Sequence, residues 1–150
     1  MKGKPITILL VEDDSAHAEI VRRNLEMLQI PKRLMWVTDG QAALDYLYHV
    51  NEYAAPAIAP TPAMILLDLR LPKLDGLEVL RTLKVEPLLK LIPVVVMSTS
   101  SAASDIERAY EYHANSYVTK PLDLAQFTAT LETLGYYWLR WNELPEVVVA

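Results

Sequence analysis

Short, unbroken apolar runs alternate along the chain with longer segments in which apolar residues recur every three or four positions. An unbroken run of aliphatic and β-branched residues predicts a strand that is buried on both faces. The three-to-four spacing predicts a helix with one apolar stripe. The predicted strands are residues 6–11, 34–37, 64–68, 93–97 and 116–119.

Five helices are predicted between and after these strands. The first begins at Asp13 or Asp14, whose side chain would cap it, and Pro31 ends it. The second helix is predicted to follow residue 40, the third to begin near residue 75, and the fourth to cover residues 101–113. The fifth is predicted from an apolar stripe at Leu124, Phe127, Leu131, Leu134 and Trp138.

This alternation predicts an α/β fold, an open parallel sheet with helices on both faces. Residues 53–62 hold three prolines and follow neither period, so we expect a long loop before the third strand. In open parallel sheets, ligands bind beyond the carboxyl ends of the strands. The residues at those ends are therefore the first candidates for chemistry.

The composition limits the possible functions. The chain has 150 residues, the length of one domain, and its net charge of −5 argues against a nucleic-acid partner. It has no cysteine, which excludes disulfides, thiolate metal sites and a cysteine nucleophile. No apolar stretch is long enough to span a membrane or to form a signal peptide. We expect a soluble, cytoplasmic protein that binds neither nucleic acid nor membrane.

Charged and hydroxyl residues stand where the predicted strands end. Glu12 and Asp13 follow the first strand, and Asp68 ends the third. Ser98 follows the fourth strand and Lys120 the fifth. Carboxylates that converge repel one another unless a cation lies between them, and oxygen ligands suit Mg²⁺ or Mn²⁺. With an ammonium and a hydroxyl beside it, such a metal would neutralise a phosphoryl group that a carboxylate attacks.

Each of these residues also has a simpler interpretation. An acid after a strand often only caps the next helix, and we favour that interpretation for Asp14. Ser98 and Thr99 are as well explained by a cap on the following helix. The combination is more specific than its parts, because helix capping does not require a lysine at position 120.

Four motifs in order carry a resemblance to the receiver domains of two-component response regulators. Residues 8–14 (ILLVEDD) resemble the family's acidic motif, and residues 66–76 (LLDLRLPKLDG) its phosphoacceptor signature. Residues 93–98 (PVVVMS) and 117–121 (YVTKP) resemble its fourth and fifth strands. The resemblance runs from about residue 6 to residue 134. It implies a flavodoxin-like, doubly wound sheet of five parallel strands in the order 2-1-3-4-5.

The resemblance implies that Asp68 accepts a phosphoryl group as an acyl phosphate. Glu12, Asp13 and Asp68 would hold Mg²⁺ or Mn²⁺, with the backbone carbonyl of Arg70 as a further ligand. The side chain of Arg70 would either contact the phosphoryl group or guard it. The protein would then be a signalling phosphoacceptor that assists its own phosphorylation, and not an enzyme with turnover.

The resemblance also assigns the residues that respond to phosphorylation. Ser98 would hydrogen-bond one phosphoryl oxygen, and Lys120 would pair with another. Tyr117 would be the switch aromatic, which turns inward when Ser98 moves toward the phosphoryl group. Such a switch requires two states of similar free energy, so that the modification can shift their populations.

Three segments resemble the single-domain regulators that are paired with cyanobacterial and other bacterial phytochromes. They are residues 97–100 (MSTS), 113–121 (HANSYVTKP) and 137–145 (YWLRWNELP). This resemblance implies a sensor histidine kinase of the phytochrome type as the partner that supplies the phosphoryl group. No histidine of the chain belongs to a receiver motif, although His17 lies where it could add specificity for the kinase.

The end of the chain is more aromatic than an exposed tail should be. We assign residues 1–135 to the receiver domain and 136–150 to a C-terminal extension. Trp138 is expected to cover the core, and residues 147–150 either extend a contact surface or form a disordered tail. The chain is expected to form a homodimer through a surface that includes Tyr136, Tyr137 and Trp141.

Three other functions fit the sequence less well. A phosphohydrolase with Asp68 as nucleophile would need a second aspartate two residues later, where this chain has Arg70. A nucleotide-binding domain of this topology needs a glycine-rich phosphate loop, and neither common form of that loop occurs. A receiver-like binding module that is never phosphorylated would not need the phosphorylation residues, all of which are present.

Overall fold

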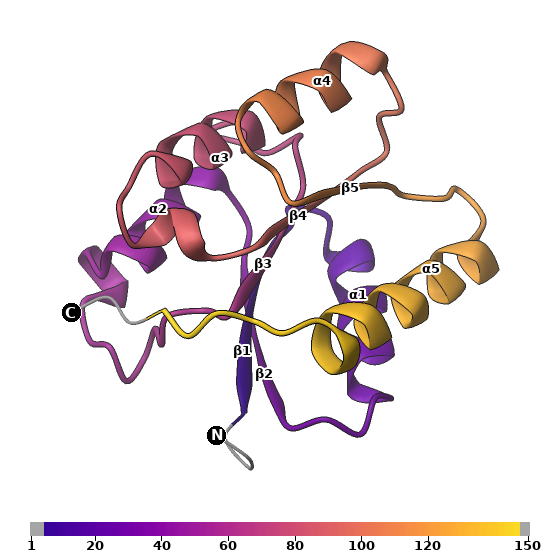
Figure 1. The fold of residues 1–150 in the computed structure, drawn as a ribbon, viewed down its shortest axis with the longest axis horizontal. Coiled ribbons are helices and arrows are strands. Elements are labelled where there is room, and N and C mark those ends of the chain that lie inside the picture. Colours follow the sequence, from indigo (N-terminus) through magenta and orange to yellow (C-terminus); the bar gives the residue numbers. More distant parts are fainter. Residues whose placement is uncertain (1–4, 148–150) are drawn as a thin grey trace.

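The computed structural model describes residues 5–147, and in it five parallel strands form one twisted sheet (Figure 1). Their order is β2-β1-β3-β4-β5, which confirms the predicted topology. The strands are β1 (Ile6–Val11), β2 (Lys32–Val37), β3 (Met64–Leu67), β4 (Val94–Ser98) and β5 (Ser116–Thr119).

Helices cover both faces of the sheet, as predicted (Figure 1). The helices α1 (Ser15–Glu26) and α5 (Leu124–Tyr136) pack on one face. The helices on the other face are α2 (Gly40–Tyr48), α3 (Gly76–Lys84) and α4 (Ala103–Glu111).

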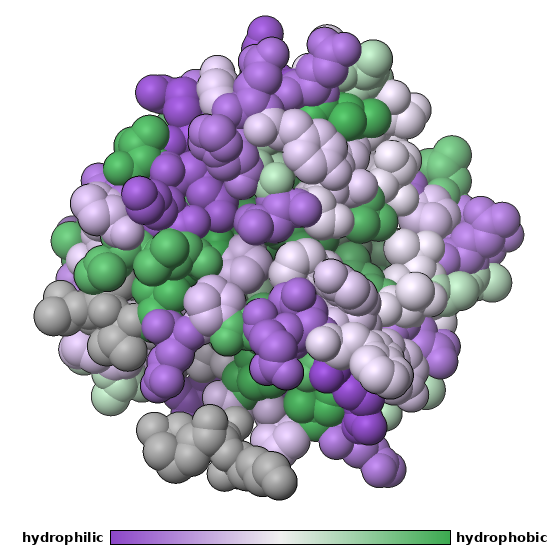
Figure 2. Space-filling model, in the orientation of Figure 1, coloured by the Kyte–Doolittle hydropathy of each residue, from purple (hydrophilic) through white to green (hydrophobic). Residues whose placement is uncertain are grey.

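Each central strand contributes to two cores. Leu9 and Val11 of β1 lie in the core beneath α2 and α3, whereas Ile8 and Leu10 lie in the core beneath α1 and α5. Successive strand residues point to opposite faces, and both faces are covered, so the whole run must be apolar. On the outer surface, hydrophobic residues lie scattered among hydrophilic ones (Figure 2). Because the inner strands are covered on both faces, their polar residues stand at the strand ends.

Some helix ends differ from the prediction. The helix α1 ends at Glu26, and α4 is shorter than the predicted 101–113. The pattern places Leu124 on the apolar stripe of the last helix, but this side chain is 62% exposed. It is the first residue of α5, one turn before Phe127, which is the first to reach the core.

The chain after α5 crosses the amino-terminal end of the sheet and connects the two layers (the yellow segment of Figure 1). It begins with a π-helical segment, η3 (Tyr137–Trp141). Trp138 packs against the α1/α5 core as expected, and Leu139 is buried there. Val147 is buried in the opposite core, so it is neither an exposed contact residue nor a free tail. Residues 148–150 lie outside the described part of the chain.

The predicted long loop between α2 and β3 is present, and its own contacts anchor it. It starts with a single 3₁₀ turn, η1 (Asn51–Tyr53). The hydroxyl of Tyr46 donates to the Pro60 carbonyl at 2.8 Å, and Nε2 of His49 donates to the Ala59 carbonyl at 2.7 Å. Ala59 is fully buried. Among residues 5–147, no helix is both long and apolar enough to cross a bilayer.

Lys84, the last residue of α3, is buried among neutral acceptors. Its Nζ donates to the carbonyls of Lys90 and Ile92 at 3.0 and 2.8 Å. It also donates to Oδ1 of Asn115 at 3.0 Å. This oxygen accepts the backbone N–H of Val94 as well, so Lys84 ties α3 to the starts of β4 and β5. Burial lowers the pKa of Lys84 from 10.5 to about 8.

We therefore predict that Lys84 makes the protein more stable as the pH rises from about 8 to 10.5. In that range the unfolded chain binds more protons at this residue than the folded chain, so the free energy of unfolding increases with pH. The increase is at most about 3 kcal/mol. Urea denaturation at several pH values measures it, and Lys84→Met should lack this rise. The control Lys90→Met, which changes an exposed lysine, should keep the rise. If the free energies of unfolding of wild type and Lys84→Met differ by the same amount at every pH, Lys84 is not the source of the pH dependence.

Candidate functional site

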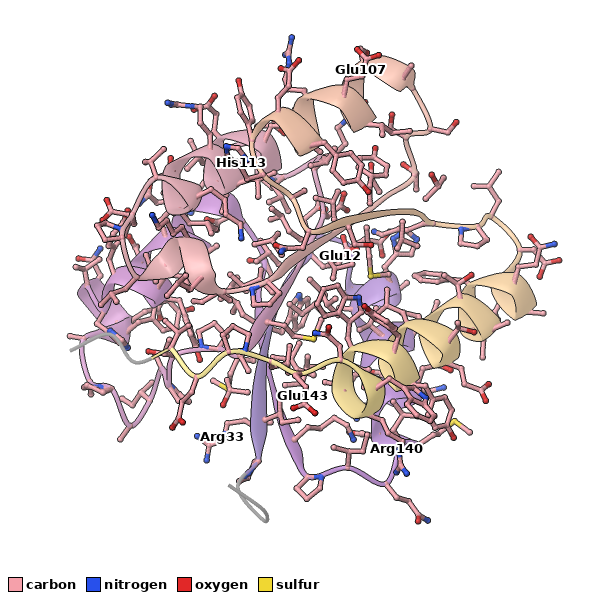
Figure 3. All side chains as sticks on the ribbon, viewed as in Figure 1. Glu12, Arg33, Glu107, His113, Arg140 and Glu143 are labelled. Atoms are coloured by element: carbon pink, nitrogen blue, oxygen red, sulfur yellow. The ribbon has the colours of Figure 1, made fainter. Side chains whose placement is uncertain are left out.

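Four strands deliver polar side chains to one edge of the sheet. Glu12 directly follows β1, and Asp68 directly follows β3. Ser98 is the last residue of β4, and Lys120 directly follows β5. The parallel ladder extends to these positions, because Asp68 N donates to the Val11 carbonyl at 3.0 Å and Lys120 N to the Ser98 carbonyl at 2.7 Å. The four predicted site residues therefore lie together at the carboxyl edge, where Figure 3 labels Glu12.

The ammonium of Lys120 joins the two buried acids. Its Nζ donates to Oε1 of Glu12 and, at 3.0 Å, to Oδ2 of Asp68. A third contact joins Nζ to Nδ1 of His17 at 3.1 Å. Lys120 and Glu12 are only 4% and 2% exposed, so these bonds form away from water. The three contacts use all three N–H donors of the ammonium.

Burial dominates the electrostatics of Glu12 and raises its pKa to about 7. The hydrogen bond and charge of Lys120 lower this pKa, and the neighbouring Asp68 raises it. The two carboxyls lie side by side and are buried, so their ionised forms need a nearby cation. Lys120 supplies one positive charge, and a metal ion between the acids would supply more.

The acids at this edge fit a divalent metal. Glu12, Asp13 and Asp68 can each offer one oxygen, and these oxygens lie within 4.8 Å of one another. Asp13 is exposed, so water can complete the coordination shell of a hard cation. The backbone N–H of Arg70 donates to Oδ1 of Asp68 at 3.2 Å, which fixes the other oxygen of that carboxylate.

The two capping interpretations have different outcomes. Asp14 is the N-cap of α1 and accepts the backbone N–H groups of Ala16 and His17 at 2.9 and 3.2 Å, as favoured from the sequence. Ser98 does not cap α4, which starts after Ala102. The Ser98 side chain is fully buried, and its Oγ accepts the Ser100 N–H at 3.1 Å.

A chain of polar contacts leads from this edge to the first turn of α4. The hydroxyl of Tyr117 donates to the Ser100 carbonyl at 2.8 Å. The hydroxyl of Ser100 donates to Oδ2 of Asp105 at 2.6 Å. The same oxygen accepts Nη2 of Arg70 at 2.9 Å. The Arg70 guanidinium, whose role the sequence left open, is therefore bonded to α4.

Two close neighbours of the acids are not predicted by the sequence pattern. His17, which we considered only for kinase specificity, contacts Lys120 directly. Trp36, near the end of β2, donates Nε1 to the Glu12 carbonyl at 2.7 Å although its side chain is 45% exposed. The only local signals are that His17 stands three residues after the cap Asp14 and that Trp36 stands next to the strand end. Neither signal indicates which atom the side chain reaches.

The arrangement at this edge is that of a receiver domain. It consists of paired acids, an aspartate, a buried hydroxyl and a lysine at the carboxyl edge of a 2-1-3-4-5 sheet. The family described as "response regulator receiver domain" matches residues 8–132, and the chain belongs to this family. It is thus a phosphoacceptor signalling protein by family.

Individual relatives extend over nearly the same length. The probable methanogenesis regulatory protein FilR2 of Methanothrix harundinacea is 48% identical, over 94% of this chain and 88% of that protein. The response regulator Rcp1 of Synechocystis is 41% identical, over 94% of each protein. The solved structure of the phosphorylated cyanobacterial phytochrome response regulator RcpA has a TM-score of 0.90 at 41% identity, over 95% of this chain and 99% of that chain. The Mn²⁺-bound structure of Rcp1 also has a TM-score of 0.90 and covers 95% of this chain and 100% of that chain.

The indole of Trp36 should report metal binding at this edge, because it is bonded to the backbone of Glu12. In a Trp138→Phe/Trp141→Phe background, we expect Mg²⁺ or Mn²⁺ to change Trp36 emission. Asp13→Asn should weaken the affinity roughly tenfold or more, since it removes a charged ligand.

The matched control is Asp14→Asn, which keeps the helix cap and should change the affinity by no more than about twofold, because the lost charge is exposed and screened. Equal losses in the two variants would contradict the metal site.

Proposed function

We propose that this protein is the phosphoacceptor of a two-component phosphorelay, in which Asp68 takes a phosphoryl group from a phosphohistidine of a sensor histidine kinase. The position of the Asp68 carboxylate carries this proposal: one oxygen is bonded to the buried Lys120 ammonium and the other to the Arg70 N–H. In the transfer, an Asp68 oxygen forms a bond to phosphorus while the P–N bond breaks, and the departing imidazole nitrogen takes up a proton.

Glu12, Asp13, Asp68 and the backbone carbonyl of Arg70 would hold Mg²⁺, or Mn²⁺ in its place. The metal, when bound, offsets the repulsion between the carboxylates and the incoming phosphoryl oxygens. Lys120, which is buried, adds a positive charge on the β5 side.

Ser98 and Tyr117 would pass the signal outward. The buried Ser98 Oγ accepts the Ser100 N–H, and its own O–H can still donate. A shift of the turn 98–100 toward Asp68 would bring this O–H to a phosphoryl oxygen. The same turn carries the Ser100 carbonyl, which is the acceptor of the Tyr117 hydroxyl. A shift of the turn would therefore break the bond between the Tyr117 hydroxyl and Ser100, and the half-buried ring could then turn further inward.

Arg70 would couple the new charge to α4. Its guanidinium is bonded to Asp105, and the two side chains are 63% and 17% exposed. Phosphorylation adds negative charge two residues from Arg70, and this charge competes with Asp105 for the guanidinium. The first turn of α4 then loses a bond at the same time as Ser100 shifts.

We infer that the protein signals by protein–protein contact in the cytoplasm, without turnover as an enzyme and without a nucleic-acid or membrane partner. Its net charge of −5 suits protein contacts better than nucleic acid. The alternative is a phosphohydrolase that uses Asp68. Such an enzyme needs a general acid two residues later, where this chain has Arg70, and an arginine does not serve as a general acid.

We infer that the kinase is a light sensor of the phytochrome type. This inference is supported by the 41% identity with the cyanobacterial phytochrome regulator RcpA over almost the whole chain. The FilR2 relative, at 48% identity, has a name that concerns methanogenesis. A histidine kinase for another signal is therefore the alternative partner.

Phosphorylation is tested with a small acyl-phosphate donor and Mg²⁺, followed by intact mass. Wild type should gain one phosphoryl group, and Asp68→Asn should gain none, because an amide is not a nucleophile here. Asp75→Asn, which changes a nearby aspartate outside the acid cluster, should react like wild type. A folded wild type that stays unmodified overturns the proposal, and sustained hydrolysis of a phosphate ester favours the hydrolase.

We propose that residues 1–135 form the receiver domain and that the extension 136–150 contributes to a homodimer surface. Tyr136, Tyr137 and Trp141 are 42%, 53% and 76% exposed. Tyr137 lines an open groove of about 450 Å³ between β5 and α5, and Trp138 lines it as well. The strand β5 is also the edge of the sheet, so this side presents unpaired backbone groups as well as aromatic rings.

The dimer is tested by sedimentation equilibrium. Tyr136→Ala/Trp141→Ala should weaken self-association roughly tenfold or more, because exposed aromatic residues dominate the binding energy of protein interfaces. Tyr48→Ala removes a partly exposed tyrosine from α2, on the opposite face, and should leave self-association unchanged. Association that is the same in all three proteins would remove this surface from the proposal.

A further inference from the structure

His17 completes the set of acceptors around Lys120. The ammonium has three N–H bonds, and they point to Glu12, Asp68 and His17. Two of these acceptors are carboxylates of the acid cluster, and the third is the imidazole Nδ1. Since an ammonium can only donate, Nδ1 must carry a lone pair, and the ring proton of a neutral His17 must be on Nε2.

Packing on two helices fixes the orientation of the imidazole. His17 lies in the first turn of α1, where its backbone N–H is bonded to the cap Asp14 at 3.2 Å. Its ring meets the Phe127 ring of α5 edge to face, with centroids 5.8 Å apart and an interplanar angle of 84°. Only 31% of the side chain is exposed. The Nδ1 atom is therefore held toward Lys120 from the first turn of α1.

The three acceptors differ in what phosphorylation does to them. Asp68 becomes an acyl phosphate, and Glu12 lies among the acids that would bind the metal. His17 lies beside Glu12, with Nδ1 3.7 Å from Oε1, but it is not one of the clustered acids. Phosphorylation of Asp68 therefore leaves the His17 imidazole chemically unchanged. A lysine side chain has four rotatable bonds, so an acceptor that does not change is what keeps the ammonium aimed at the reacting oxygen.

We propose that His17 is a positioning residue for phosphorylation: its Nδ1 holds the Lys120 ammonium against the position where the phosphoryl group binds. This inference rests on the proposed function of Asp68 and goes beyond it, because it assigns the reaction a residue outside the receiver motifs. His17 touches neither the phosphoryl group nor the donor in this role; it acts through Lys120.

Two substitutions separate the lone pair from the packing. His17→Asn places an amide oxygen near the position of Nδ1 and removes the ring. His17→Phe keeps a ring against Phe127 and removes the acceptor. The rate of Asp68 phosphorylation at saturating acyl phosphate should fall roughly fivefold to tenfold in His17→Phe and should be largely restored in His17→Asn. The donor concentration at half-maximal rate should be similar in both variants.

The control and a second readout keep the test independent of activity. His113→Asn changes an exposed histidine that lies apart from Glu12 in Figure 3, and its positive φ of 70° is one that asparagine tolerates. This variant should accept the phosphoryl group at the wild-type rate. In protein without donor or metal, the ¹⁵N resonance of His17 Nδ1 should be that of an unprotonated nitrogen, and Lys120→Met should shift it.

The outcomes distinguish this inference from the proposed function. If wild type is phosphorylated but His17→Asn and His17→Phe are equally slow, or His17→Phe is as fast as wild type, the positioning role is wrong and the function of Asp68 stands. A protonated Nδ1 in wild type overturns the hydrogen bond itself. A wild type that takes up no phosphoryl group overturns the proposed function, and the role of His17 falls with it.

Discussion

The buried ammonium of Lys120 makes the polar edge of this sheet possible. Two carboxyl groups that are removed from water beside each other would favour protonation or local unfolding. Lys120 opposes both outcomes, because it donates to Glu12 and Asp68 in a place where water cannot. If one partner of such a buried set is lost, the remaining charges are left uncompensated. Lys120 thus lets the carboxylates lie close together, because it offsets part of their negative charge.

The fold follows from the need to bring these groups together. Glu12 and Lys120 are 108 residues apart in the chain, and Asp68 is 52 residues from Lys120. Parallel strands that all end at one edge bring the three side chains together, and no particular loop conformation is needed for this. The apolar strands keep other polar groups away, and the segment after α5 closes the opposite end of the sheet. The contacts of Arg70 with Asp105 and of Tyr117 with Ser100 then connect a structural change at this edge to the first turn of α4.

The sequence predicts the sheet and its acids because both depend on regular patterns. Strands covered on two faces are apolar throughout, and the carboxyl ends of parallel strands must meet, so Glu12, Asp68 and Lys120 could be assigned together. Leu124 was misplaced because helical periodicity does not show where a helix first reaches the core. The contacts of His17 and Trp36 depend on side chains that cross from α1 and β2, over sequence separations of 103 and 24 residues. No local pattern encodes such contacts.

The central claim is that this edge binds an acyl phosphate on Asp68 with Lys120 as its fixed cationic partner. A crystal structure with Mg²⁺ and beryllofluoride, a mimic of the phosphoryl group, tests it directly. We expect beryllium bonded to a carboxylate oxygen of Asp68, the Lys120 ammonium bonded to a fluorine, and Ser98 moved toward the mimic. Beryllofluoride bound elsewhere, or a Lys120 that turns away from the bound mimic, would contradict it.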